Sequence, residues 1–234
     1  MRSLKVKFQM SESMVLAIFL TLAGGFQDAY SYNCRGKVFA NAQTGNIVLL
    51  GQNLAQGNFT TAVHYLLPLA AFLAGVYVTG WVQHFYKYHE RIHWRQIVVA
   101  IEVVLLIVVG FLPQSWNTPA NMMMSFACAM QVNSFRKFGG LPCATTMCIG
   151  NMRSATDLLS QYHITKDPEL KMKSMKYYFV ILIFAVGAAV GAMLSIWLGE
   201  QAIWISAGLL FIGFVMMFVK EEEEKLEEKR EKDH

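Results

Sequence analysis

Long apolar runs separated by short polar segments are the main pattern in this sequence. A helix that crosses the hydrocarbon of a bilayer needs about 20 mostly apolar residues. Six runs come close to that length, at about 13–33, 61–85, 96–113, 118–136, 176–198 and 201–219. We therefore predict an all-α integral membrane protein with six transmembrane helices, forming one membrane domain over residues 1–234 and surrounded by lipid.

Composition supports this class of protein. The chain is 55% apolar and 15% charged, whereas soluble domains average about 45–50% apolar and about 25% charged residues. These values argue against a water-soluble fold. The charged residues are confined to short segments, so the net charge gives no indication of a nucleic-acid partner.

The distribution of Lys and Arg predicts the orientation. Cytoplasmic loops of membrane proteins carry an excess of these residues. They concentrate near the N-terminus (Arg2, Lys5 and Lys7), in the 86–95 loop and in the 137–175 segment, which lie on one side if six spans are counted. Both termini are therefore expected in the cytoplasm, with residues 220–234 as a charged cytoplasmic tail.

A weak internal repeat divides the chain into two halves. Thr44-Gly45-Asn46 recurs as Ile149-Gly150-Asn151, and the same offset aligns Asp28 with Asn133. The halves cover about 13–113 and 118–219. Each would contain three spans, an odd number, so the second half would be inverted relative to the first, as in many transporters. Chance similarity remains the alternative.

Each half carries a short helix around its Gly-Asn motif. The segments 44–57 and 149–161 are too short or too polar to span alone, so we expect interfacial or re-entrant half-helices that follow the first span of each half. Thr44, Asn41, Asn46 and Asn151 suit helix starts, where side-chain oxygens cap backbone N–H groups. Two facing helix N-termini would form a donor-rich centre for an anion or polar solute. The alternative is two polar turns that cap surface helices.

Two acidic residues lie inside predicted spans. Asp28 and Glu102 could carry a proton, because ionisable groups in the membrane are costly and usually functional. Asp28 is the stronger candidate, since Gln27, Tyr30, Gln131 and Asn133 give it polar surroundings. Its alternative role is structural, as the partner of Arg35 or Arg136.

One motif points to an enzyme instead. His89-Glu90-Arg91-Ile92-His93 matches the spacing of a zinc-binding helix, but no third ligand is evident near it. We therefore predict no metal, no cofactor and no enzymatic activity. Gly187 and Gly191 form a small-residue face that suits either a contact between the halves or a homodimer seam.

Three runs carry a family resemblance: GFQDAYSY (25–32), FANAQTGN (39–46) and TTMCIGNMR (145–153). They resemble the YoaK-like bacterial membrane proteins, the family of domain of unknown function 1275 (UPF0700), and the resemblance covers nearly the whole chain. It implies a bacterial inner or plasma membrane and six spans, but no substrate. Ile149 departs from the Thr often found there in the family, so the two half-sites are not expected to bind identically.

Together, these patterns predict a small secondary transporter or channel for a polar or anionic solute, acting as a possible homodimer. A non-transporting membrane partner or sensor is the alternative, and a zinc enzyme using His89 and His93 is a third. The expected proton-coupling residues are Asp28 and Glu102. The expected solute-binding residues are Gln27, Asp28, Tyr30, Asn41, Thr44, Gly45, Asn46, Gln131, Asn133, Arg136, Gly150, Asn151 and Arg153.

Overall fold

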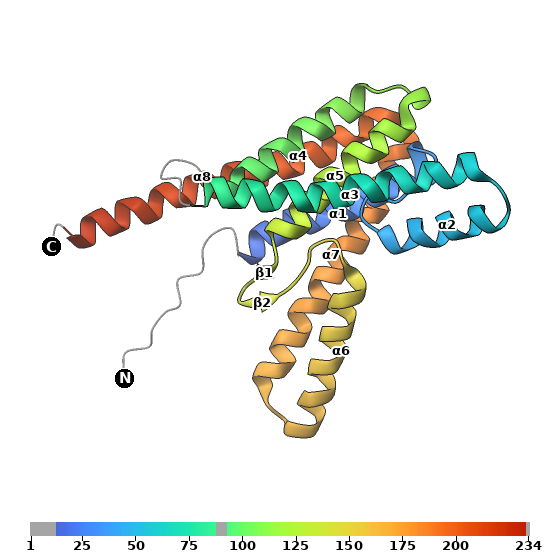
Figure 1. The fold of residues 1–234 in the computed structure, drawn as a ribbon. Coiled ribbons are helices and arrows are strands. Elements are labelled where there is room, and N and C mark those ends of the chain that lie inside the picture. Colours follow the sequence, from blue (N-terminus) through green and yellow to red (C-terminus); the bar gives the residue numbers. More distant parts are fainter. Residues whose placement is uncertain (1–12, 88–92, 233–234) are drawn as a thin grey trace.

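The computed structural model describes residues 13–87 and 93–232 and is built almost wholly of helices (Figure 1). The α-helices are α1 Met14–Cys34, α2 Gln43–Ala55, α3 Phe59–Tyr86, α4 Trp94–Phe111, α5 Asn117–Ser134, α6 Cys148–Thr165, α7 Pro168–Leu198 and α8 Ile203–Lys232. The short elements are the 3-10 turns η2 Gln114–Trp116 and η3 Gly199–Ala202, and the paired strands β1 Lys137–Phe138 and β2 Leu141–Pro142.

Four helical segments of the described chain are long and apolar enough to cross a membrane. They are Met14–Cys34, Phe59–Tyr86, Trp94–Phe111 and Pro168–Phe218, the last of which contains α7, η3 and most of α8. The prediction of an all-α membrane protein is confirmed. The α5 helix is not among the four, because it carries polar residues such as Asn121, Gln131 and Asn133. The count of six spans therefore stays a prediction.

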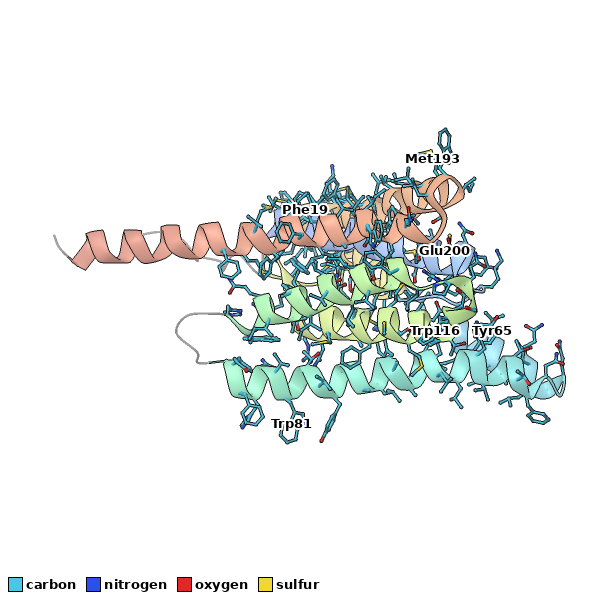
Figure 2. The ribbon with its side chains drawn as sticks, turned by 90° about the horizontal axis from the view of Figure 1, so that it is seen from above. Phe19, Tyr65, Trp81, Trp116, Met193 and Glu200 are labelled. Atoms are coloured by element: carbon cyan, nitrogen blue, oxygen red, sulfur yellow. The ribbon has the colours of Figure 1, made fainter. Side chains whose placement is uncertain are left out.

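The outer surface of the helices is apolar. Trp81 points away from the bundle on the outer side of α3 (Figure 2) and is 52% exposed. Met193 occupies a similar outward position on α7. Large apolar side chains that face outward from membrane helices are covered by lipid tails, so this surface is the one expected in contact with the bilayer.

The helices pair across the two halves of the chain. The α1 helix packs on α7 and α8, whereas α5 packs on α3 and α4, and α4 packs on α8. The α2 and α3 helices form one helical hairpin, and α6 and α7 form another, of which α6 and the first part of α7 project away from the other helices (Figure 1). Each half therefore buries its surface mainly against the other half.

Glycines allow the closest of these contacts. A Cβ atom at Gly187 would lie 2.2 Å from the carbonyl oxygen of Leu22, and one at Gly75 would lie 2.4 Å from that of Phe126. The backbones of α7 and α1, and of α3 and α5, therefore touch directly, as small residues permit between membrane helices. The small-residue face of α7 is thus a contact between the halves, and the homodimer stays a prediction.

A buried arginine ties the helix ends together where α1 and α4 end. Arg35 is 0% exposed, and its guanidinium donates to the carbonyl oxygens of Val109 at 2.7 Å and Leu112 at 2.8 Å. Its Nε donates to the hydroxyl of Tyr30 at 2.9 Å, and that hydroxyl donates to the carbonyl oxygen of Glu200 at 2.7 Å. A cation is favoured at the carbonyl end of α4 by the helix dipole. We call this end of the molecule the arginine end. We call the opposite end, where α3 finishes and α4 begins, the tail end.

Candidate functional site

Five buried polar residues from different elements meet inside the bundle. Gln27 of α1 donates through Nε2 to Glu102 Oε1 of α4 at 3.4 Å and to Ser206 Oγ of α8 at 3.2 Å. The amide of Gln131 in α5 is assigned the orientation that satisfies its neighbours. In that orientation its nitrogen donates to Glu102 at 2.8 and 3.2 Å, and its oxygen accepts from Thr145 Oγ1 at 3.0 Å. We call these residues the central polar cluster. They connect α1, α4, α5 and α8 with the loop before α6.

Four residues of the cluster occupy corresponding positions in the two halves. Gln27 and Gln131 are 104 positions apart (131 minus 27), and so are Glu102 and Ser206 (206 minus 102). The first pair donates to Glu102 from two sides. The offset that relates the halves is thus one residue shorter in these helices than at the Gly-Asn motifs. Only Glu102 among the four can release a proton, so the cluster is chemically asymmetric.

Glu102 has amide neighbours and no ionic one. Its side chain is 0% exposed, and none of the described Lys, Arg or His residues lies within ion-pair distance of it. The side-chain oxygen of Gln27 has no hydrogen-bond donor among the described residues. A buried, unpaired carboxylate is costly, whereas a protonated carboxyl group has an O–H that such an oxygen can accept. The surroundings of Glu102 therefore favour a protonated carboxyl group.

The second buried acid holds the start of α2. Asp28 Oδ1 accepts from the backbone N–H of Asn41 at 2.6 Å and of Ala42 at 3.4 Å. The Asn41 side chain donates to the carbonyl oxygen of Gly24 at 2.8 Å, near the middle of α1. Asp28 forms no ion pair with Arg35 or Arg136, so that structural alternative is wrong. The carboxylate of Asp28 instead accepts from the backbone N–H groups that could otherwise bind an external anion at the start of α2.

The start of α6 reaches the same part of α1 from the other half. Thr145 bonds to Gln131 in the central polar cluster. Thr146 Cγ2 lies 2.7 Å from where a Cβ atom on Gly24 would be. The α2 and α6 helices therefore begin beside the same glycine. The start of α6 is linked to Glu102 through Thr145 and Gln131, whereas the start of α2 is bound to α1 through Gly24 and Asp28.

The two Gly-Asn motifs share one structural role. Asn46 donates to the carbonyl oxygen of Phe39 at 2.7 Å, and Asn151 donates to that of Ala144 at 2.7 Å, in both cases seven residues earlier. Each asparagine therefore fastens its helix to the preceding loop. The expectation that side-chain oxygens of Thr44, Asn41, Asn46 and Asn151 cap the helices is wrong, because neither α2 nor α6 has a side-chain N-cap.

The two motif glycines differ. A Cβ atom at Gly45 would lie 3.0 Å from the ring of Phe39, whereas one at Gly150 would have nothing within 4 Å. Gly150 instead borders open space. Thr44 is exposed at the surface of α2 and joins no contact of the central polar cluster.

A cleft of about 520 Å³ opens beside the start of α6. It holds four of the predicted binding residues, namely Asn133, Arg136, Gly150 and Asn151, and is otherwise lined by Phe72, Val76, Val132, Pro142, Cys143, Ala144, Met147 and Ser154. Arg136 is exposed and bonds to Asn133 through its guanidinium.

The predicted residues thus fall into separate places. Gln27 and Gln131 join Glu102, Asp28 and Asn41 hold α2, and four residues line the cleft. Tyr30 belongs to the contact around Arg35 at the arginine end, and Arg153 lies exposed on α6 outside the cleft lining. Sequence reasoning missed Thr145, Ser206 and Arg35. The spacing of 104 positions was a signal for Ser206, because it matches that of the two glutamines.

The zinc alternative gains no support from His93. Its Nδ1 accepts from the backbone N–H of Arg95 at 3.2 Å, and its backbone N–H donates to Gln96 Oε1 at 2.9 Å, so these residues cap the start of α4. His89 lies outside the described residues. Within the described part of the chain, no three His, Cys, Asp or Glu residues are grouped so that they could hold a metal ion.

Most of the chain matches one known family of proteins. Residues 16–216, which include the central polar cluster and both Gly-Asn motifs, match the family described as "Protein of unknown function (DUF1275)". The chain belongs to the DUF1275 family. It is 25% identical over 205 residues to the UPF0700 transmembrane protein YoaK of Bacillus subtilis (strain 168), covering 84% of this chain and 90% of that protein. No solved structure matches the chain. The relative is named a transmembrane protein, and together with the four candidate spans of this chain it supports a multi-pass membrane protein.

Proposed function

We propose that this protein is a proton-coupled secondary transporter of a small polar solute. The observation that carries the proposal is that two half-helices, one from each half, begin beside Gly24, and that the start of α6 is linked through Thr145 and Gln131 to the buried carboxyl group of Glu102. Broken helices that begin inside the bundle, at the interface of two halves, are typical of transporter binding sites. The backbone there is irregular, which a membrane tolerates only inside protein or along a wet cavity.

The proposal includes six spans arranged as two inverted halves. The reciprocal packing of α1 with α7 and of α5 with α3 supports it. The equal roles of Asn46 and Asn151 support it as well. In this arrangement α5, although polar, is shielded from lipid by α3 and α4. With the termini in the cytoplasm of a bacterial cell, the tail end would face inward.

Each group then has a role. Glu102 would carry the coupled proton, because it contacts both halves, whereas Asp28 is engaged in holding α2. The solute would enter the cleft beside α6 from the cytoplasm, since the arginine end is closed by Arg35. Asn133 and Asn151 offer polar contacts there. An anionic group of the solute would bind near Arg136, because the backbone N–H groups before α2 already donate to Asp28.

The competing function is a non-transporting membrane partner or sensor. One observation favours it: Gln27, Glu102, Gln131 and Ser206 are each at most 1% exposed. A cluster sealed from water also suits a purely structural link between helices. Buried polar networks are used in that way to specify packing.

Proton movement in liposomes distinguishes the two functions. Purified protein would be reconstituted with a pH-sensitive dye inside, and amino acids, mono- and dicarboxylates, phosphate and sugars would be added in turn. We expect one solute class to drive saturable proton movement that is absent from protein-free liposomes. If folded protein moves protons with none of them, the partner function becomes the better account.

A further inference from the structure

A second pocket lies at the tail end, where α3 finishes, α4 begins and α5 finishes. Its volume is about 240 Å³, and its lining is Gln83, Trp94, Arg95, Asn133, Ser134, Arg136 and Lys137. Three of these side chains are cationic and none is acidic. Within the described chain, this pocket therefore combines polar donors with a concentrated positive charge.

The cations are held in different ways. Arg95 donates through Nε to the carbonyl oxygen of Ser134 at 3.0 Å and stacks its guanidinium over the ring of Trp94, 5.4 Å from its centre. Arg136 is oriented by two bonds to Asn133. Lys137 is exposed and donates no hydrogen bond to a described residue. Two guanidinium groups are thus positioned before any ligand arrives, which lowers the entropic cost of binding.

A buried hydroxyl group beside the pocket lacks a hydrogen-bond partner, as do several other buried side chains of the described chain. Ser134 lines the pocket and is 2% exposed, yet its Oγ has no partner among the described residues. Buried hydroxyl groups are nearly always hydrogen-bonded. Because this Oγ is itself covered, the side chain would turn toward the pocket to donate to an anion's oxygen atom.

The place of the pocket indicates which anion. It lies where one candidate membrane span finishes, at Tyr86, and the next begins, at Trp94. That level of a bilayer contains lipid phosphates, and basic pockets between helices recognise them. Arginine guanidinium groups also match the geometry of phosphate oxygens.

We propose that this pocket binds a phosphate group, supplied either by an anionic lipid headgroup or by a phosphate compound in the water. The proposal does not depend on transport, because binding is measured without it. Arg136 lines both this pocket and the larger cleft beside α6. An occupant here would therefore lie beside the cleft entrance.

Binding to the purified full-length protein tests the pocket. Native mass spectrometry would count retained phosphatidylglycerol against phosphatidylcholine, and titration with inorganic phosphate would follow tryptophan fluorescence. The variant is Arg136→Gln with Lys137→Gln, which removes two exposed cations. The control, Arg153→Gln with Lys171→Gln, makes the same charge change on α6 and α7.

We expect the pocket variant to bind phosphate groups about 30-fold more weakly, with the control unchanged. Loss confined to phosphatidylglycerol identifies a lipid site, and loss confined to inorganic phosphate identifies an aqueous ligand. Equal loss in both double variants would indicate a general charge effect and overturn the proposal. Absence of binding to the unmodified protein in both arms would overturn it as well. Thermal unfolding of each variant shows whether the fold is retained.

Discussion

Replacing Gly25 with alanine is expected to leave little folded protein. The added Cβ atom would lie 2.1 Å from the carbonyl oxygen of Phe184 and 2.9 Å from the backbone nitrogen of Ala188. Both atoms belong to the backbone of α7, so no side chain can move to make room. The two helices must separate, and the contacts of α1 with α7 are lost. We expect a loss of about 3 kcal/mol or more in the free energy of unfolding.

Two other glycines provide matched controls. Nothing lies within 4 Å of a Cβ atom at Gly80 or Gly208, both of which are in helices. Alanine there should be neutral, or stabilising by up to about 1 kcal/mol through helix propensity. Yield and thermal unfolding in detergent, followed by size-exclusion fluorescence, would compare the variants. Equal behaviour of Gly25→Ala and Gly80→Ala would show that α1 and α7 do not pack as described.

The Glu102→Gln variant is expected to fold but to lose proton coupling. Glutamine keeps an oxygen that can accept from Gln27 and Gln131, and its amide nitrogen can donate to the unpaired oxygen of Gln27. It therefore resembles a permanently protonated glutamate. A transporter locked in that form can exchange solute across the membrane but cannot use a proton gradient. We expect accumulation driven by a pH gradient to fall at least about tenfold, with solute exchange retained.

Two further variants separate coupling from folding. Glu102→Ala removes the acceptor of the Gln131 amide and one of the two acceptors of the Gln27 amide, which keeps its bond to Ser206. An unpaired buried donor costs about 1–3 kcal/mol, so this variant should unfold at a lower temperature. Glu169→Gln makes the same chemical change in an exposed pair with Lys173 and should behave like the unmodified protein. Unchanged accumulation by Glu102→Gln would remove Glu102 from the coupling mechanism.

The sequence predicted the helical elements well because their signals are local. Apolar runs predicted α1, α3, α4, α7 and α8, and the Gly-Asn motifs predicted the short helices α2 and α6. Most helix ends were also close, but α7 begins at Pro168 rather than near 176, and α8 continues to Lys232 rather than ending near 219. These features depend on the length of an apolar run or on a single helix start, which a sequence displays directly.

The roles of the two acids could not be predicted in the same way. Asp28 seemed the better proton carrier because polar residues surround it in the sequence, yet the loop before α2 returns to bind it. Glu102 has apolar neighbours along α4, and its polar partners come from α1 and α5. Which helix faces meet depends on close packing at Gly25, Gly75 and Gly187, which sequence spacing alone does not specify.

Accessibility of the two half-helix starts tests the central claim most directly. Single cysteines at Ala42 and Thr145, in a chain with Cys34, Cys128, Cys143 and Cys148 replaced by serine, would be exposed to a membrane-impermeant thiol reagent from either side. Ile164→Cys, on the exposed surface of α6, is the positive control, and buried Leu106→Cys is the negative control.

A transport pathway through this site predicts that Thr145→Cys reacts from the side of the charged tail, Ala42→Cys reacts from the opposite side, and a transported solute slows both reactions. If both cysteines react as slowly as Leu106→Cys from each side, water does not reach the half-helix starts. That result would contradict the transporter account.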